Sequence, residues 1–326
     1  MNCHRTSPGT WHSDAQAPAA LRRRPPSAAE IVHGQFGISA YGVQVGIQLD
    51  DPTLVEPITQ CLPPGWKPYP FAMVKRVYTI RTASEPGSPR VSKGEPPLSA
   101  SSRYLLSVAP ASGEGLIGGR QSPSTAEAKN RKLLLELLES DLHLFVAARA
   151  RNLFVHAGVV VWHGSAIVIP GHSYSGKTTL VQAFMRRGAH YYSDEYAVFT
   201  GSGRVRPFAR PLSIRIEGKP HRLRVPAPAS HKPGGPITVK LLLFTEFRPG
   251  TAWDPSAITP GETILSLISN TVPARRRPKR TLSILARVVA GSAAIAAVRG
   301  EAAEVVDSVL SWIEAGVPAQ PTGGAL

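Results

Sequence analysis

Hydrophobic and polar residues alternate in the first third of the chain, and this pattern predicts strands. In residues 43–49 every second position is apolar and the positions between are glutamine or glycine, which is the period of a half-buried strand. Residues 74–82 and 104–108 predict two further strands, and the acid-proline step at 51–52 predicts the start of a short helix. We therefore expect a small, strand-rich α+β region over residues 34–125.

A helical period follows, and beyond it strands and helices alternate. Apolar residues recur at helical spacing through residues 126–151. Further strands are predicted at 153–162, 165–169, 191–193, 197–199 and 240–244, and further helices at about 177–187, 261–270, 280–290 and 301–315. His163 and Gly164 form a predicted turn between the first two of these strands. The pattern is typical of an α/β fold.

Stretches rich in proline, serine and glycine lie at the ends of the chain and between the predicted strands. Residues 1–33 contain a run of arginines and prolines, and we expect a disordered basic tail there. A second tail is expected at 317–326, and mobile loops are expected at 83–102 and 109–125. The second folded domain is predicted over 126–316.

Charge and cysteine content limit the classes of function. The 326 residues include 37 Lys and Arg against 22 Asp and Glu, a net charge of +15. This charge favours an anionic partner such as a nucleotide, a nucleic acid, an acidic peptide or a membrane surface, without choosing among them. The apolar stretch at 288–298 is too short to span a membrane, and residues 1–24 lack the apolar core of a secretory signal. With only Cys3 and Cys61, neither a disulfide framework nor a zinc site is expected, so we predict a cytoplasmic protein without a membrane span.

One segment matches a phosphate-binding loop in full. Residues 171–178 fit the pattern G-x-x-x-x-G-K-[ST], between an apolar strand and an amphipathic helix. In such loops glycines let backbone amides surround phosphate oxygens, and the helix N-terminus adds partial positive charge. Lys177 would reach the β- and γ-phosphates of ATP, and the Thr178 hydroxyl would bind Mg²⁺. The residues predicted to bind the nucleotide are Gly171, His172, Ser173, Tyr174, Ser175, Gly176, Lys177, Thr178 and Thr179.

Two adjacent acids and a histidine are the candidates for the chemistry itself. Asp194 and Glu195 follow the predicted loop and helix, at the end of a short strand. Two such carboxylates can divide the roles of Mg²⁺ ligand and general base that phosphoryl transfer needs, although an acid pair can also be a solvated turn. His156 precedes the loop by one predicted hairpin, which would bring its side chain toward the nucleotide, although a lone histidine is more often structural. Asp194, His156 and Lys177 are the predicted catalytic residues, and Thr178, Glu195 and Asp194 are the predicted metal ligands.

These segments resemble the catalytic core of HPr kinase/phosphorylase-like proteins. The family pattern reads His-Ala or His-Gly, a hairpin, GxSGxGKS/T, a helix ending in Arg-Gly, and a strand ending in Asp-Asp. The matching residues here are 154–158, 166–171, 175–180, 187–189 and 193–195. A segment at 211–215 is similar as well. The convincing match covers 153–216 and a weaker one continues to about 315.

The resemblance implies a fold and an activity. It implies a phosphoenolpyruvate-carboxykinase-like P-loop core, in a catalytic domain over residues 126–316. It also implies ATP- and Mg²⁺-dependent phosphorylation of a serine hydroxyl on a protein or peptide. Carried over by position, Asp194 is the first choice for the general base and Glu195 for the metal, and the two roles are open to reversal. His156 matches the family histidine that lies close to the acids.

The chain departs from the family pattern at several points. The second acid is Glu195 rather than aspartate, and Tyr174 stands where a small residue is usual. No segment matches the loop used for dephosphorylation, and the N-terminal region does not match the regulatory domain, so neither phosphorylase activity nor HPr as substrate is expected. Divergent relatives act on peptides, for example on lasso-peptide precursors, which fits a variable N-terminal region.

The sequence leaves other functions open. A non-catalytic, ATP-binding regulatory protein would account for the altered acid pair, and a small-molecule kinase is a further alternative. A nucleic-acid ATPase is the reading least favoured, because helicase motifs are absent, so we do not expect nucleic acid as a partner. The basic run at 275–280 would hold phosphate or an acidic peptide, or form a solvated face. A homo-oligomer is left open.

Overall fold

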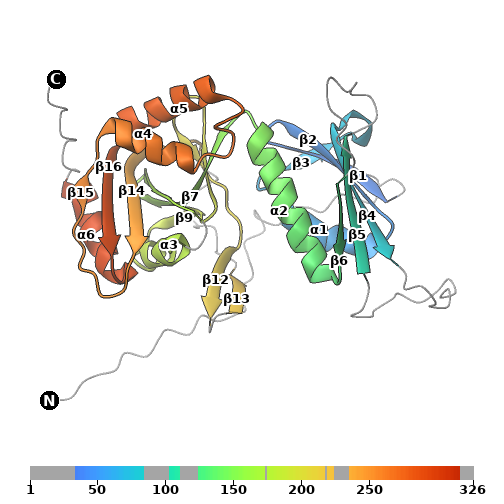
Figure 1. Ribbon diagram of the computed structural model, residues 1–326, viewed down its shortest axis with the longest axis horizontal. Coiled ribbons are helices and arrows are strands. Elements are labelled where there is room, and N and C mark those ends of the chain that lie inside the picture. The colour runs from blue at the N-terminus through green and yellow to red at the C-terminus, as the bar shows by residue number, and fades with distance from the viewer. Residues whose placement is uncertain are drawn as a thin grey trace, which may run out of the picture.

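The computed structural model describes residues 34–83, 103–110, 124–172, 175–216, 219–223 and 235–315. The two predicted tails, most of the two predicted loops, and Ser173 and Tyr174 lie outside the described residues. Two mixed β-sheets with helices on their faces make up the described part of the chain, so the α/β class is confirmed (Figure 1). None of the helices in these ranges is long and apolar enough to cross a membrane.

The first sheet has the strand order β3-β1-β2-β4-β5-β6. Its strands are β1 (Gln35–Ala40), β2 (Val43–Leu49), β3 (Lys67–Tyr69), β4 (Arg76–Ala83), β5 (Arg103–Pro110) and β6 (Ser124–Ala128). Two short 3-10 helices, η2 (Pro52–Leu54) and η3 (Phe71–Met73), and the helices α1 (Val55–Cys61) and α2 (Arg131–Arg149) belong to the same half of the chain. The three strands predicted here are confirmed as β2, β4 and β5.

The long predicted helix is shorter than its apolar pattern suggested. Residues 124–128 form the edge strand β6 paired with β5, and the helix begins only at Arg131. Asn130 sets this start because its side-chain oxygen accepts a hydrogen bond from the backbone amide of Leu133 at 2.9 Å. The prediction of helix from residue 126 was therefore wrong at its N-terminal end.

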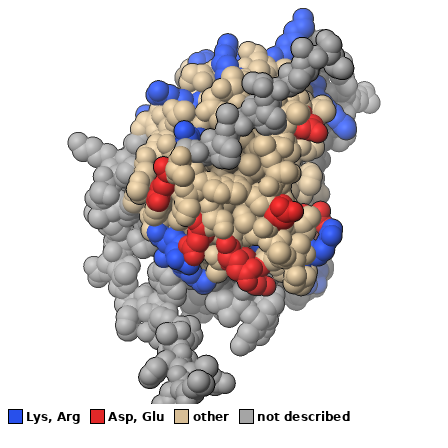
Figure 2. Space-filling model, turned by 90° about the vertical axis from the view of Figure 1, so that its left-hand side faces the viewer, with Lys and Arg blue, Asp and Glu red and all other residues tan. Residues whose placement is uncertain are grey.

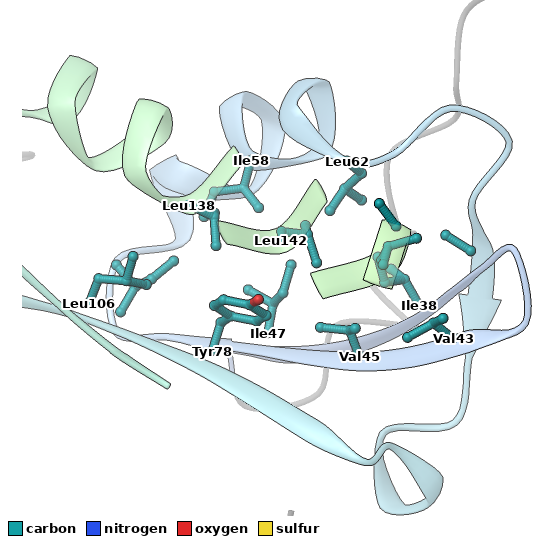
Figure 3. Packing of buried hydrophobic residues seen from close by; sticks show 14 of the residues in the cluster. Ile38, Val43, Val45, Ile47, Ile58, Leu62, Tyr78, Leu106, Leu138 and Leu142 are labelled. Atoms are coloured by element: carbon teal, nitrogen blue, oxygen red, sulfur yellow. The ribbon is translucent and has the colours of Figure 1, made fainter. Parts of the chain in front are cut away.

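Helix α2 packs on the first sheet rather than on the second. Leu138 and Leu142 face Ile47 and Tyr78 in the core of this half of the molecule (Figure 3). Helix α1 closes the same face, where Ile58 is fully buried. The predicted division at residue 126 thus falls inside one packed unit, since this hydrophobic core continues through α2.

The second sheet has the strand order β11-β10-β7-β8-β14-β16-β15, and β9 also pairs with β7. Its strands are β7 (Leu153–Trp162), β8 (Ser165–Pro170), β9 (His190–Ser193), β10 (Tyr196–Phe199), β11 (Val205–Arg206), β14 (Val239–Phe247), β15 (Ser256–Ala257) and β16 (Ala293–Arg299). A separate hairpin pairs β12 (Leu212–Ile216) with β13 (Lys219–Leu223). The helices are α3 (Lys177–Arg186), α4 (Pro260–Ser269), α5 (Pro278–Ala290) and α6 (Ala302–Ala315).

Helices cover the second sheet on both faces (Figure 1). Helices α3 and α6 pack on the face that carries Leu241 and Leu243, and α4 and α5 pack on the face that carries Leu242. Because both faces are buried, β8 and β14 are continuous apolar runs rather than alternating ones. The sequence did not reveal β16, which begins inside the apolar stretch at 288–298 and ends at Arg299.

The parallel strands of this sheet end at one edge. Strands β8, β14 and β16 are parallel neighbours, and their carboxyl ends are Pro170, Phe247 and Arg299. The predicted turn between β7 and β8 is confirmed, with positive φ at both His163 and Gly164 as a tight hairpin turn requires. Ligands in α/β sheets commonly bind beyond the carboxyl ends of the strands, so this edge is where a site is expected.

Helix α2 offers a direct test of the packing. Leu138 is fully buried against the first sheet, whereas Leu144 on the same helix is 50% exposed. We expect Leu138→Ala to lower the free energy of unfolding by about 2–5 kcal/mol, because the change leaves a cavity. Leu144→Ala is the matched control and should change it by less than about 1 kcal/mol. Urea denaturation followed by circular dichroism measures both; equal effects would contradict this placement of α2.

Candidate functional site

The predicted phosphate loop connects the end of β8 to the start of α3. The backbone amide of Gly171 donates to the carbonyl of His156 at 3.2 Å, which joins the beginning of the loop to β7. At the other end Gly176 precedes α3 with a left-handed φ of 82°, and its carbonyl accepts from the amide of Leu180 at 3.1 Å. The free amides at the N-terminus of α3 therefore lie at the loop, where they favour an anion.

Both glycines of the loop are favoured by space, and Gly176 is favoured by its left-handed φ as well. A Cβ atom on Gly171 would lie 2.6 Å from the Ser175 hydroxyl oxygen. A Cβ atom on Gly176 would collide with the guanidinium of Arg299. The structure thus gives a local reason for each glycine of the motif.

Residues 156–158 of β7 hold the loop on one edge and the acid pair on the other. Val159 is opposite Ser193 of β9, and His156 is opposite Tyr196 of β10. Asp194 and Glu195 form the break between these two strands and lie beside β7, where the amide of Ala157 donates to the carbonyl of Glu195 at 3.1 Å.

Small residues allow this close approach. On the other edge of β7, Ala157 is opposite Pro170, the last residue before the loop. A Cβ atom on Gly158 would lie 2.7 Å from a methyl group of Val181 on α3. An alanine and a glycine next to His156 therefore let the loop, the acids and α3 meet around one short stretch of strand.

Lys177 lies between the loop and the acid pair. Its ammonium group donates to the carbonyl of His172 within the loop. Burial lowers the pKa of Lys177 below its usual value, and the nearby charge of Asp194 partly opposes this shift. Of the two carboxylates, Asp194 is therefore the one whose charge acts on the lysine of the loop.

His156 lies next to Lys177 and faces the aromatic ring of Tyr196. The centroids of the His156 and Tyr196 rings are 4.7 Å apart. Burial lowers the pKa of His156 below 6.5, and the positive charges of Lys177 and His172 lower it further. The imidazole is therefore neutral at pH 7, with one nitrogen able to donate and the other able to accept a hydrogen bond.

The two acids have different surroundings. The hydroxyl of Tyr191 donates to the Asp194 carboxylate at 2.9 Å, and burial raises the pKa of Tyr191 so that this hydroxyl keeps its proton. The Ser193 hydroxyl oxygen accepts from the amides of Glu195 at 3.1 Å and Tyr196 at 3.0 Å, which fixes the turn. Asp194 is thus held at the loop by a neutral donor.

Glu195 is paired with a cation that the sequence did not suggest. Arg210 forms ion pairs with Glu195 and with Glu139 of α2. The carbonyl of Arg210 also lies 3.0 Å from the Tyr191 hydroxyl. Because Glu139 is almost fully buried, this arginine links the helix of the first sheet to both acids of the turn.

A buried arginine at the end of β16 forms a hydrogen bond with the backbone of the loop, on the side away from the acid pair. Arg299 is 1% exposed, and its guanidinium donates to the carbonyls of Gly176 at 3.1 Å and Gly300 at 3.0 Å. Burial lowers its pKa, while the charge of Glu301 acts against this. In the sequence Arg299 is a single charged residue after an apolar run, which is a weak signal for a functional residue. Its role is visible only in the structure, where β16 pairs with β14.

The basic run at 275–280 has a structural role at two of its positions. Arg277 donates to two of the carbonyls at 149–151, at 2.9 and 3.1 Å, and Arg280 donates to a third at 2.7 Å. These carbonyls belong to the last residue of α2 and to the two residues after it, where helices leave acceptors without partners. Arg277 and Arg280 therefore satisfy that helix end, which neither the phosphate-binding nor the solvated interpretation anticipated.

The donor set at the loop fits a magnesium ion that is shared with phosphate. Thr178 supplies a hydroxyl at the start of α3, and Asp194 supplies a carboxylate whose charge acts on the neighbouring Lys177. Within the ranges that the structure describes, no three His, Cys, Asp or Glu side chains gather as a metal site of protein ligands alone. Mg²⁺ in nucleotide sites commonly takes one or two carboxylates and completes its shell with phosphate oxygens and water.

The Arg210 bridge can be tested through stability. Arg210→Met removes the cation that Glu139 meets inside the fold, and we expect the free energy of unfolding to fall by about 3–5 kcal/mol. Arg248→Met is the matched control, since Arg248 and its partner Glu246 are both exposed, and it should cost less than about 1 kcal/mol.

A double variant completes this test. Glu139→Gln should cost less in the Arg210→Met background than in the wild type, because the two side chains interact. Additive losses in urea denaturation would show that the bridge carries no coupling.

Comparison of the chain with protein-family models and with curated proteins gives no match. The resemblance to HPr kinase/phosphorylase-like proteins therefore depends on the residues quoted above, and the functional argument depends on the geometry of the site.

Proposed function

We propose that this protein is an ATP-dependent kinase that transfers the γ-phosphate to a serine hydroxyl of a protein or peptide. The observation that carries the proposal is the meeting of Lys177, His156 and Asp194 around a phosphate loop, at the edge of a mixed sheet where its parallel strands end. The core is proposed to be a P-loop fold of the phosphoenolpyruvate-carboxykinase type. In support, a hairpin precedes the loop and the acid pair lies beside the hairpin's first strand.

The loop supplies the binding of the triphosphate. Its backbone and the N-terminus of α3 offer amide donors, and Lys177 would exchange the carbonyl of His172 for a phosphate oxygen. Thr178 and a carboxylate of the turn would hold Mg²⁺, which neutralises charge on the β- and γ-phosphates when bound. Thr179, which is exposed in the first turn of the same helix, remains a proposed nucleotide contact.

Asp194 is assigned the role of general base. It would accept the proton of the serine hydroxyl as that oxygen forms a bond to the γ-phosphorus and the bond to the bridging oxygen breaks, releasing ADP. The hydroxyl of Tyr191 orients this carboxylate. His156, neutral because of its lowered pKa, is assigned to positioning the acceptor hydroxyl beside Asp194.

Glu195 remains the carboxylate proposed for the metal, with Arg210 orienting it. The ion pair with Arg210 also favours the reversed assignment, because a fixed cation beside Glu195 opposes a divalent ion there. The same ion pair supports the second candidate function, a regulatory protein that binds ATP without transferring phosphate. In that case Glu195 serves the fold rather than the chemistry.

The proposed acceptor is a protein or peptide rather than nucleic acid. The face that carries α6 shows acidic as well as basic side chains, with acidic ones gathered in its lower half (Figure 2). The excess of Lys and Arg therefore does not form a continuous basic surface on this face, as nucleic-acid binding would favour. A cytoplasmic location and an acceptor serine remain parts of the proposal.

Transfer of label from γ-labelled ATP, with Mg²⁺, tests the function. The acceptors are peptides encoded beside the gene, and label is expected on serine. Lys177→Ala should abolish transfer, and Asp194→Asn should keep ATP affinity while slowing transfer by about 100-fold or more. Lys132→Ala, which changes an exposed lysine of α2, is the matched control and should transfer normally.

Two results would count against this account. Full transfer by Lys177→Ala would remove the loop from the mechanism. Binding of Mg-ATP without transfer to any hydroxyl would favour the regulatory alternative.

A further inference from the structure

An exposed aromatic ring lies beside the phosphate loop, on the side away from the acid pair. Phe247 ends β14, and it is 44% exposed although the rest of that strand's apolar residues are largely buried. Strand β14 ends next to α3 at the edge that carries the loop (Figure 1). Among the residues that the structure describes, Phe247 belongs to none of the three hydrophobic cores, so its position at this edge needs another explanation.

Phe247 and Arg299 form one unit with the loop. The two residues are opposite each other in the parallel pair of β14 and β16, so their side chains lie on the same face of the sheet. The guanidinium carbon of Arg299 lies over the Phe247 ring at 5.2 Å from its centroid. A Cβ atom on Gly176 would lie 3.8 Å from that of Phe247, so Phe247 adjoins the residue that precedes α3.

The proposed chemistry gives the bound triphosphate a direction. The γ-phosphate must reach Asp194 and His156, which belong to the side of the loop where β7, β9 and β10 lie. Strand β8 separates that side from β14 and β16. The α-phosphate and the nucleoside would therefore extend toward β14 and β16, where Phe247 is an exposed aromatic side chain at the end of β14.

We infer that Phe247 is the surface on which the base of the nucleotide stacks, an inference that rests on the proposed function. Arg299 covers one face of the ring and is fixed by two backbone carbonyls, while the exposure of the ring leaves a face for the base. Stacking on an aromatic ring is favourable for every base, so Phe247 supplies affinity for a nucleoside triphosphate rather than a choice between adenine and guanine. Arg299 acts as a positioning residue, because it contacts both the Phe247 ring, which we call the base platform, and the Gly176 carbonyl of the phosphate loop.

Calorimetric titration with Mg-ATP and with Mg-tripolyphosphate separates base binding from phosphate binding. Phe247→Ala should weaken ATP binding by about tenfold, the lower part of the stacking range, and leave tripolyphosphate binding unchanged. Phe247→Tyr keeps an aromatic ring and should bind ATP as the wild type does. Leu265→Ala, which changes an exposed apolar residue of α4, is the matched control and should alter neither ligand.

Lys177→Ala, measured beside these variants, keeps this inference separate from the proposed function. It should weaken both ligands, since both carry the phosphates. Suppose that Lys177→Ala weakens both ligands. If Phe247→Ala then binds ATP as the wild type does, or weakens both ligands equally, Phe247 is not the base-stacking surface, and the phosphate site is retained. If the wild type binds neither ligand, both the platform and the proposed function are overturned.

Discussion

The pairing of β7 is the constraint on which the site depends. One edge of this strand is paired with β10 and then β9, and the other edge is paired with β8. The acid pair and the loop therefore flank residues 156–158, and a shift of one residue in either register would turn His156 to the opposite face of the sheet. Because Phe154 of the same strand belongs to the core beneath α2, β7 also joins the two halves of the molecule.

Three basic side chains near the loop each have a different partner. Lys177 interacts with Asp194, Arg210 pairs with Glu195, and Arg299 supports the loop from behind. Only Lys177 belongs to the motif that the sequence shows, while the two arginines are fixed by tertiary contacts. Because Asp194 acts on Lys177 while Glu195 is paired with Arg210, the two neighbouring carboxylates are not equivalent.

The sequence predicted the elements whose structure is determined by residues close together in the chain. The strands β2, β8 and β14, the helix α3 and the loop glycines follow from periodicity and spacing within short segments. The start of α2 was wrong because Asn130 and the pairing of β6 with β5 override an apolar period. Arg210, Arg299 and Phe247 were missed because each gains its meaning from strands and helices far away in the sequence.

The central claim is that the triphosphate of a nucleotide lies along the loop, with its γ-phosphate toward the acids. A crystal structure with Mg²⁺ and a non-hydrolysable ATP analogue tests this most directly. The account predicts the β-phosphate among the amides of residues 171–178, the γ-phosphate beside His156 and Asp194, and the base toward Phe247. A nucleotide bound in the reverse direction, or away from the loop, would contradict it.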